Sequence, residues 1–187
     1  MLTTTHVAPA RPDDLDAAAE TLALAFESSP WTDWVIPEDR HLERLYELQR
    51  LYLAHALEHG RVWVAPATVG VIALLPHDAP EPPEDVVDQI IELHGDRVDR
   101  LGGVGMQETA GSWHVETLGV RPEERRRGVA SALLVAALSE ARAQGVPVTL
   151  ETSDQQNLRL YERYGFVVVD HTKVPAGPDV WAMARHR

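Results

Sequence analysis

The sequence predicts a mixed α/β (α+β) domain in which helices cover the faces of a mixed sheet. Three observations support this fold class. Two long helical patterns precede the first strong strand signal. Short, valine-rich segments bounded by proline or glycine then recur between later helical patterns. The last third of the chain alternates strand, helix, strand and helix before a terminal hairpin, an order typical of a mixed sheet with helices on its faces.

Composition supports one globular domain over residues 1–187. The chain is 44% hydrophobic and 25% charged. Its length suits a single domain. No apolar run approaches the roughly 18 residues of a membrane helix, so no membrane partner is expected. The first residues lack a basic segment followed by an apolar core, so we expect no secretory signal and a cytoplasmic location. The absence of cysteine excludes disulfides and thiolate metal sites.

The net charge of −12 bears on the choice of partners. Binding to nucleic acid relies on lysine and arginine displacing counterions, so an acidic chain is a poor candidate for it. A cationic substrate is favoured electrostatically; the alternative is that the acidic surface only keeps the protein dispersed. Basic residues are unevenly spread, because five of the 17 fall between Arg121 and Arg142.

The N-terminal part is predicted to be mainly helical. A short strand is expected over 5–10, followed by a helix over 12–26 that begins with proline and two aspartates. Two prolines interrupt the helical pattern in 27–40, which carries two tryptophans. A second long helix is expected over 40–59, ending at Gly60.

The middle of the chain is predicted to contain a hairpin and a third helix. Valine-rich segments at 61–66 and 68–76 form the hairpin. The helix is expected over 84–101, broken or ended near Gly95. Residues 102–111 have no apolar period and are expected to form a loop. Their Gly-Gly-Val-Gly run lacks the spacing and flanking elements of a nucleotide-binding fingerprint.

The last third is predicted to alternate strands and helices. The expected elements are strands over 112–120 and 146–152, helices over 125–145 and 157–165, and a hairpin formed by 166–174 and 179–185.

The stretch "VRPEERRRGVASALL" joins the strand at 112–120 to the next helix. Val120 ends the strand, Pro122 fixes the turn, and Gly128 stands where the helix begins with its first N–H groups free. Those amides and the helix dipole favour an anion, and a residue without Cβ lets a phosphate approach closely. The Gly-Lys-Ser or Gly-Lys-Thr of a P-loop is absent. The stretch therefore predicts a phosphate-binding turn, with a solvated, arginine-rich turn as the alternative.

Two segments of the sequence resemble motifs of one enzyme family. Arg125-x-x-Gly128-x-Ala130, preceded by "LGVRP" and followed by "SALL", resembles the acyl-CoA pyrophosphate loop of the GNAT N-acetyltransferases. "VTLETSDQQNLRLYERYGF" is similar to the family's later strand and helix, with Tyr161 in the tyrosine position. Segments such as "DRHLERLYELQRLYL" and "VPAGPDVWAM" extend the resemblance to the branch of the family that acetylates aminonucleoside antibiotics of the puromycin type.

The resemblance implies the GNAT fold, a mixed and mostly antiparallel sheet of about seven strands flanked by helices. The strands near 113–120 and 147–152 would splay apart to admit the pantetheine arm of acetyl-CoA. The implied activity is acetyl-CoA-dependent transfer of an acetyl group to the amine of a small molecule. Transfer would be direct, because no cysteine is available to hold an acyl group. The alternatives are an acetyltransferase for protein or peptide amines and a non-catalytic CoA-binding module. Monomer and homodimer both stay open.

The resemblance also implies which residues bind the cofactor. The expected cofactor-binding residues are Leu118, Gly119, Val120, Arg125, Arg126, Arg127, Gly128, Val129, Ala130, Ser131, Asn157 and Tyr161. Main-chain donors of the turn would bind the pyrophosphate, and an arginine side chain would reach a phosphate of CoA. The main chain near Leu118 would polarise the thioester carbonyl. The alternative for Asn157 is to cap the helix.

Acyl transfer to an amine also needs a base and an acid. By resemblance Tyr161 is the general acid; the alternative is a tyrosine that packs its helix on the sheet. Alternation along a strand puts His114, Glu116 and Leu118 on one face. Glu116 is the first choice for the base, directly or through water, and His114 the second. This role comes from the residues and not from the resemblance, and a charged pair on a half-exposed strand is the alternative.

The acceptor is expected to meet aromatic and acidic side chains. The expected substrate-binding residues are Trp31, Asp33, Trp34, Trp113 and Glu151. The first three lie between the first two long helices, at a position that lines the acceptor site in this family, and they suit a flat, cationic amine. Core packing of the tryptophans and a structural hydrogen bond of Glu151 are the alternatives. His55 and His59 lack a third ligand beside them, so no metal is expected.

Overall fold

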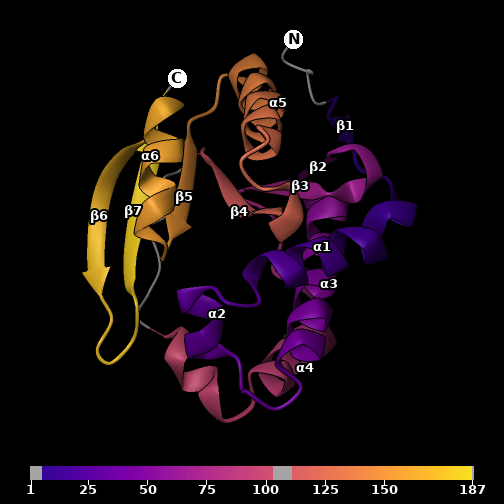
Figure 1. Ribbon diagram of the computed structural model, residues 1–187, viewed down its shortest axis with the longest axis vertical. Helices are drawn as coiled ribbons and strands as arrows, with labels where there is room; N and C mark the ends of the chain where they lie inside the picture. Colours follow the sequence, from indigo (N-terminus) through magenta and orange to yellow (C-terminus); the bar gives the residue numbers. More distant parts are fainter. Residues whose placement is uncertain (1–5, 103–110, 187) are drawn as a thin grey trace.

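The computed structural model describes residues 6–102 and 111–186, and the order of its elements follows the prediction (Figure 1). Within these residues the strands are β1 (Ala8–Pro9), β2 (Arg61–Val64), β3 (Gly70–Pro76), β4 (Trp113–Val120), β5 (Val148–Thr152), β6 (Val167–Lys173) and β7 (Asp179–Arg185). The helices are α1 (Leu15–Phe26), α2 (Pro30–Val35), α3 (His41–His59), α4 (Glu84–His94), α5 (Val129–Gln144) and α6 (Gln155–Arg163). Short 3-10 segments are η1 (Pro12–Asp14), η2 (Pro66–Thr68), η3 (Gly95–Leu101) and η4 (Pro122–Glu124).

The strands form one mixed sheet. Among the described residues its order is β1-β2-β3-β4-β5-β7-β6, with β4 and β5 parallel and the other neighbours antiparallel. The predicted fold class, a mostly antiparallel sheet of about seven strands with flanking helices, is therefore confirmed. Residues 103–110 of the loop predicted over 102–111, and the first residue of the strand predicted over 5–10, lie outside the described residues. None of the described helices has the length and hydropathy that crossing a membrane requires.

The two parallel strands separate partway along their length. They pair only at Trp113 with Val148, at His114 with Thr149, and at Val115 with Leu150. Beyond these positions β4 stays with β3 while β5 stays with β7. The opening lies at the C-terminal ends of the strands, and the predicted splay is confirmed.

Each face of the sheet packs against its own helices. Val71 and Ala73 of β3 meet α1 and α3, in a cluster that includes Leu22. Side chains alternate along a strand, so Ile72 of the same strand points to the opposite face, where it packs against α5. That second cluster continues onto α6. The helices that follow β4 and β5 therefore flank the opening on the same face of the sheet (Figure 1).

The segment between α1 and α3 differs from the prediction, because Pro30–Val35 forms the short helix α2. Pro30 occupies the first turn, where its missing N–H costs nothing. The Ser29 side chain caps the helix by accepting a hydrogen bond from the Thr32 N–H at 3.3 Å. Serine is among the residues preferred at such a position. The proline that was expected only to break the pattern therefore also starts a helix.

The helix predicted over 125–145 begins later, at Val129. Arg126 has a φ of 62° and Gly128 a φ of 85°. Both values lie in the left-handed region that a right-handed helix excludes. The arginine triplet therefore belongs to the turn that precedes α5.

A β-bulge in β4 also corrects the prediction that His114, Glu116 and Leu118 share one face. Ala73 pairs with Thr117 while Leu74 pairs with Val115, so Glu116 is the extra residue of the bulge. A bulge interrupts the alternation of side chains. Leu118 packs with the cluster on the α5 side. His114 pairs with Leu75, which packs on the side of α1 and α3, so His114 and Leu118 lie on opposite faces.

Leu133 tests the packing of α5 on the sheet. It is fully buried, and its side chain lies close to Gly70 of β3. Leu133→Ala should lower the free energy of unfolding by about 2–5 kcal/mol, because it removes buried methyl groups and leaves a cavity. Val135 lies on the exposed side of the same helix. Val135→Ala should therefore cost less than about 1 kcal/mol. Urea unfolding measures both, and equal losses would contradict this packing.

Candidate active site

The turn before α5 exposes main-chain donors. The Gly128 C=O accepts the first helical hydrogen bond, from the Ala132 N–H at 3.0 Å. The amides of Val129, Ala130 and Ser131 therefore have no acceptor within the helix. No side chain caps this end, and a Cβ atom built on Gly128 would meet nothing within 4 Å. The space in front of these amides is open, and an anion can approach them.

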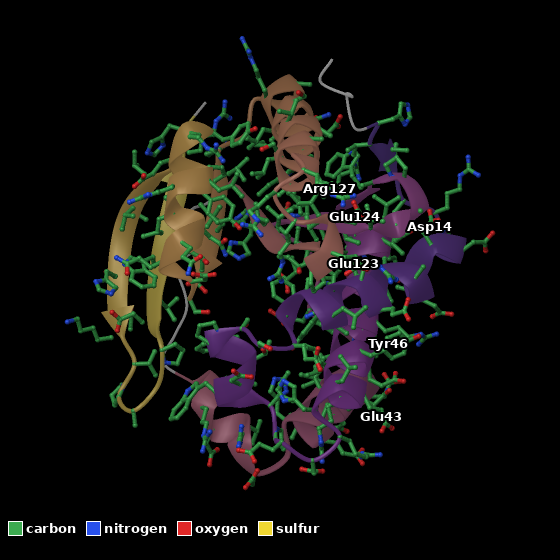
Figure 2. All side chains as sticks on the ribbon, viewed as in Figure 1. Asp14, Glu43, Tyr46, Glu123, Glu124 and Arg127 are labelled. Atoms are coloured by element: carbon green, nitrogen blue, oxygen red, sulfur yellow. The ribbon has the colours of Figure 1, made fainter. Side chains whose placement is uncertain are left out.

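The three consecutive arginines have different roles. The Arg125 side chain donates to the Ala25 C=O at 2.7 Å, at the end of α1. Arg127 pairs with Glu124 at 3.0 Å, and Figure 2 shows these two side chains together at the start of α5. Arg126 is exposed and makes no hydrogen bond or ion pair with any described residue. Arg126 is therefore the member of the triplet whose side chain is free to bind an anion.

Glu116 lies where β4 leaves β5, and its surroundings are unusual for a carboxylate. More than a third of its surface is exposed, yet burial, followed by the negative charge of Glu151, raises its pKa above the usual range. The effect of Glu151 shows that the two carboxylates lie close enough to interact. We call the partly exposed surroundings of Glu116 and Glu151, where β4 and β5 separate, the recess.

Tyr52 is a third residue of this recess, and the sequence reasoning missed it. Burial, followed by the charge of Glu116, raises the pKa of Tyr52 to about 12, so its hydroxyl stays protonated at neutral pH. The signal in the sequence was weak. Tyr52 lies one turn after Leu48, which indicates that it faces the core, but nothing in the spacing pairs α3 with β4.

His114 lies beside the recess as an uncharged group. Burial lowers its pKa to about 4, so its ring is neutral at neutral pH. Its Nδ1 lies 3.2 Å from the Thr149 Oγ1 across the paired part of β4 and β5. A ring with so low a pKa is a weak proton acceptor, which favours Glu116 over His114 as the base.

Helix α6 contributes two of the predicted residues. Tyr161 is 6% exposed, and its ring meets the ring of Phe166 edge-on at 5.8 Å. Burial, followed by the charge of Asp154, raises the pKa of Tyr161, so its phenol stays protonated. Asp154 caps α6 by accepting from the Gln156 N–H at 2.9 Å. The alternative that Asn157 caps this helix is therefore wrong, and its half-buried side chain lies within the first turn.

The predicted acceptor residues of α2 are divided between the exposed side of the helix and the side that faces the core. Asp33 is exposed, and its carboxylate lies 3.9 Å from the Nε2 of His41. Trp31 and Trp34 are half-buried and pack against the cluster that contains Ile36. Both tryptophans thus pack against the core and also remain partly exposed to solvent.

Trp113 does not come to the opening. It lies at the paired end of β4 and β5, where its ring packs against the cluster on the α5 side and lies 6.0 Å from the guanidinium of Arg61. The rings of His55 and His59 are 4.7 Å apart on α3. Within residues 6–102 and 111–186, no group of three candidate ligands is arranged to hold a metal ion.

The fold and the site together define a class of protein. The parallel strands separate beside the start of α5, whose first amides are free, and Glu116 lies where the strands separate. This arrangement suits an acyltransferase that uses an acyl-CoA. Residues 95–186, about the C-terminal half of the chain, match the family model of the acetyltransferase (GNAT) domain.

Solved structures extend the similarity in fold over the whole chain. The histone acetyltransferase HPA2 and related acetyltransferase of Corynebacterium glutamicum is 22% identical, with 98% of this chain and 97% of that chain covered and a TM-score of 0.77. The PaiA N-acetyltransferase of Thermoplasma acidophilum, in complex with coenzyme A, is 15% identical, with 99% and 100% covered and a TM-score of 0.64. An N-acetyltransferase of Staphylococcus aureus is 17% identical, with 96% and 99% covered and a TM-score of 0.61. Residues 95–186 therefore carry a GNAT acetyltransferase domain, which makes the protein an acyltransferase, and the whole chain has the fold of these structures.

The lowered pKa of His114 predicts how the stability of the folded protein depends on pH. Its folded pKa of about 4 lies below the ordinary 6.5. Between about pH 4 and about pH 6.5 the unfolded chain therefore binds a proton at His114 that the folded chain does not bind. Stability should fall as the pH drops through this window. His114→Gln should remove on the order of 2 kcal/mol of that loss between about pH 7 and about pH 4.5.

Urea unfolding at both pH values measures the difference, with His6→Gln at an exposed position as the matched control. The raised pKa of Glu116 has the opposite effect on stability in both proteins and cancels in the comparison. An unchanged pH dependence in His114→Gln would contradict the burial of a neutral His114.

Proposed function

We propose that this protein is an acetyl-CoA-dependent N-acetyltransferase that acts on a small cationic amine. The observation that carries the proposal is the position of Glu116, beside Glu151, at the bulge where β4 and β5 separate. Family membership supplies acetyl transfer, and the recess supplies the preference for an amine. An aminonucleoside of the puromycin type, or a related metabolite, is the acceptor that we propose to test first.

The residues of the turn and of α5 fit the phosphates of CoA. The open space at Gly128 and the free amides of Val129, Ala130 and Ser131 suit the pyrophosphate. Arg126, which has no described partner, would add a charge-assisted hydrogen bond to a phosphate. When bound, the cofactor supplies an acetyl thioester.

In the proposed reaction the residues of the recess manage protons and charge. Glu116, directly or through water, takes a proton from the ammonium of the acceptor. The neutral nitrogen then forms a bond to the acetyl carbon as the bond from that carbon to sulfur breaks. Main-chain groups near Leu118 stabilise the charge on the carbonyl oxygen. Tyr161 donates its proton to the departing thiolate, and the transfer is direct, since no cysteine is available to hold the acetyl group.

Charge favours a cationic acceptor. Glu116 and Glu151 raise the energy of each other's ionised form, and a positive charge between them would relieve that repulsion. The net charge of −12 attracts cations over a longer range. Trp31, Asp33 and Trp34 add aromatic faces and a carboxylate on α2. A protein or peptide amine is the second candidate, and it can be tested in the same assay.

Replacing the base is the direct test of this function. Glu116→Gln should lower kcat about 100-fold to 10,000-fold with little change in the Kd of CoA, because the amide keeps the shape and loses the proton acceptor. Tyr161→Phe should also lower kcat. Its pH profile should not move to alkaline pH, whereas that of Glu116→Gln should, because only Glu116→Gln removes the base. Release of free thiol from acetyl-CoA measures turnover with puromycin, small amines and peptides. Full activity in Glu116→Gln would reject the proposed base.

A lack of turnover with every amine and peptide would favour the non-catalytic module instead. Calorimetric binding of CoA separates that outcome from a protein that has simply lost its fold.

The arginine triplet provides a matched series for the cofactor site. Arg126→Ala should weaken CoA binding about tenfold or more, because a hydrogen bond between charged groups contributes about 1.5–3 kcal/mol. Arg127→Ala should have a smaller effect, since Arg127 is paired with Glu124. Calorimetry at two salt concentrations measures both variants. Equal losses would show that the triplet acts through its total charge and not through Arg126.

A further inference from the structure

The turn between β4 and α5, called here the cofactor turn, is bound to α1 at two places. At its start the Arg121 guanidinium donates to the Thr21 Oγ1 at 2.9 Å. Further along, Arg125 donates to the Ala25 C=O at 2.7 Å. Thr21 and Ala25 are four residues apart, so they lie on one face of the helix. Figure 1 shows α1 beside the end of β4, where the cofactor turn begins. One face of α1 therefore lies along this turn.

Arg121 is bound by protein groups through both its side chain and its main chain. Its guanidinium also pairs with Glu20 at 2.6 Å, and only 23% of its side chain is exposed. Its N–H donates to the Val69 C=O at 2.9 Å, and its C=O accepts from the Glu124 N–H at 2.9 Å. Arg126, by contrast, has no described partner. Arg121 therefore supports the turn, whereas Arg126 is free to bind a phosphate.

Thr21 joins the cofactor turn to the turn of the β2–β3 hairpin. It is fully buried, and its hydroxyl accepts from Arg121 and donates to the Thr68 C=O at 2.6 Å. Ala67 and Thr68 each have a φ of 54°. Such left-handed values are uncommon for residues with a Cβ atom, above all for a β-branched one. Strained backbone of this kind persists only where surrounding contacts hold it. A single hydroxyl is thus one of the contacts that hold this turn.

The cofactor turn contains strain of the same kind. Arg126 has a φ of 62° although it is not glycine. This left-handed residue lies just before Gly128, after which the free amides of α5 follow. Without contacts on either side, a strained residue relaxes to an ordinary conformation, and the direction of the chain changes with it. The contacts that α1 makes with the turn therefore bear on the arrangement of the free amides.

We propose that Arg121, Thr21 and Glu20 form a clamp that holds the cofactor turn in its binding conformation before CoA binds. The three are positioning residues, because they act through the main chain of the turn and not by contact with a phosphate. CoA then meets a turn that is already ordered, so its affinity is not reduced by the free energy of ordering. This inference rests on the proposed function, since it requires that CoA bind at this turn.

Thr21→Val tests the clamp without changing charge. The valine lacks the hydroxyl, so Arg121 loses an acceptor and the Thr68 C=O loses a donor. If the turn then adopts its binding conformation about a tenth of the time, the Kd of CoA rises about tenfold. The kcat at saturating acetyl-CoA should change less than about twofold, because bound CoA restores the turn. Calorimetry and thiol release measure the two quantities.

Thr21→Ser is the matched control for this variant. Serine keeps the hydroxyl, so the Kd of CoA should stay within about twofold of the wild-type value. A folded Thr21→Val protein that binds CoA as tightly as the wild type would overturn the proposal. If Thr21→Val does not fold, Glu20→Met is measured instead. It removes the more exposed arm of the clamp and should raise the Kd about threefold.

Two backgrounds separate a clamp from a general effect on stability. Arg126→Ala and Arg126→Gly both remove the guanidinium, but only glycine adopts a positive φ without strain. Thr21→Val should therefore raise the Kd of CoA about tenfold in the alanine background and about threefold or less in the glycine background. A loss of stability alone would act equally in both. Equal changes in Kd would overturn the proposal.

Hydrogen exchange without CoA separates this inference from the proposed function. The N–H groups of Arg121, Glu124 and Arg125 are hydrogen-bonded at the start of the cofactor turn. In Thr21→Val they should exchange about threefold faster or more, relative to the amides of α4, because loss of the clamp lets the turn open locally. Unchanged exchange would overturn the clamp whether or not CoA binds. Failure of the wild-type protein to bind CoA would reject the proposed function, even where exchange shows that the clamp orders the turn.

Discussion

The separation of β4 from β5 is the constraint on which the rest of the site depends. Paired strands satisfy one another's main-chain groups, so two strands that diverge after Val115 and Leu150 leave N–H and C=O groups that need other partners. The bulge at Glu116 occurs just where pairing ends, and a bulge bends and twists its strand. One local irregularity thus coincides with the opening and with the carboxylate that lies in it.

Helix α1 connects the two halves of the site. A Cβ atom on Gly119 would lie 2.7 Å from Cδ2 of Leu22, so glycine in β4 lets α1 approach the strand closely. Arg125 in the cofactor turn then donates to the Ala25 C=O at the end of the same helix. The chain turns directly from there into α2, whose capping residue is Ser29. The turn that meets the phosphates and the segment that meets the acceptor are therefore supported by one helix.

Periodic patterns predicted the long helices and the hairpins, because their apolar spacing follows from local geometry. The separation of the parallel strands was predicted through resemblance alone, since no spacing in the sequence indicates it. The bulge at Glu116, the approach of Tyr52, and the hydrogen bond from Arg121 to Thr21 were not predicted, because each depends on elements far apart in the chain. Three consecutive arginines are equivalent in sequence. Their different roles follow from the left-handed backbone at Arg126 and from neighbours supplied by α1 and η4.

The electrostatics of the recess agree with the proposed choice of base. A neutral His114 cannot offset the charge of Glu116, so the repulsion from Glu151 is not compensated from that side. A carboxylate with a raised pKa accepts a proton from an ammonium group more readily than an ordinary one. An incoming cation stabilises both carboxylates until it gives up its proton, and after that transfer the repulsion ends because Glu116 is neutral. The paired acids therefore favour binding of the charged amine and also its deprotonation, which a single exposed carboxylate would do less well.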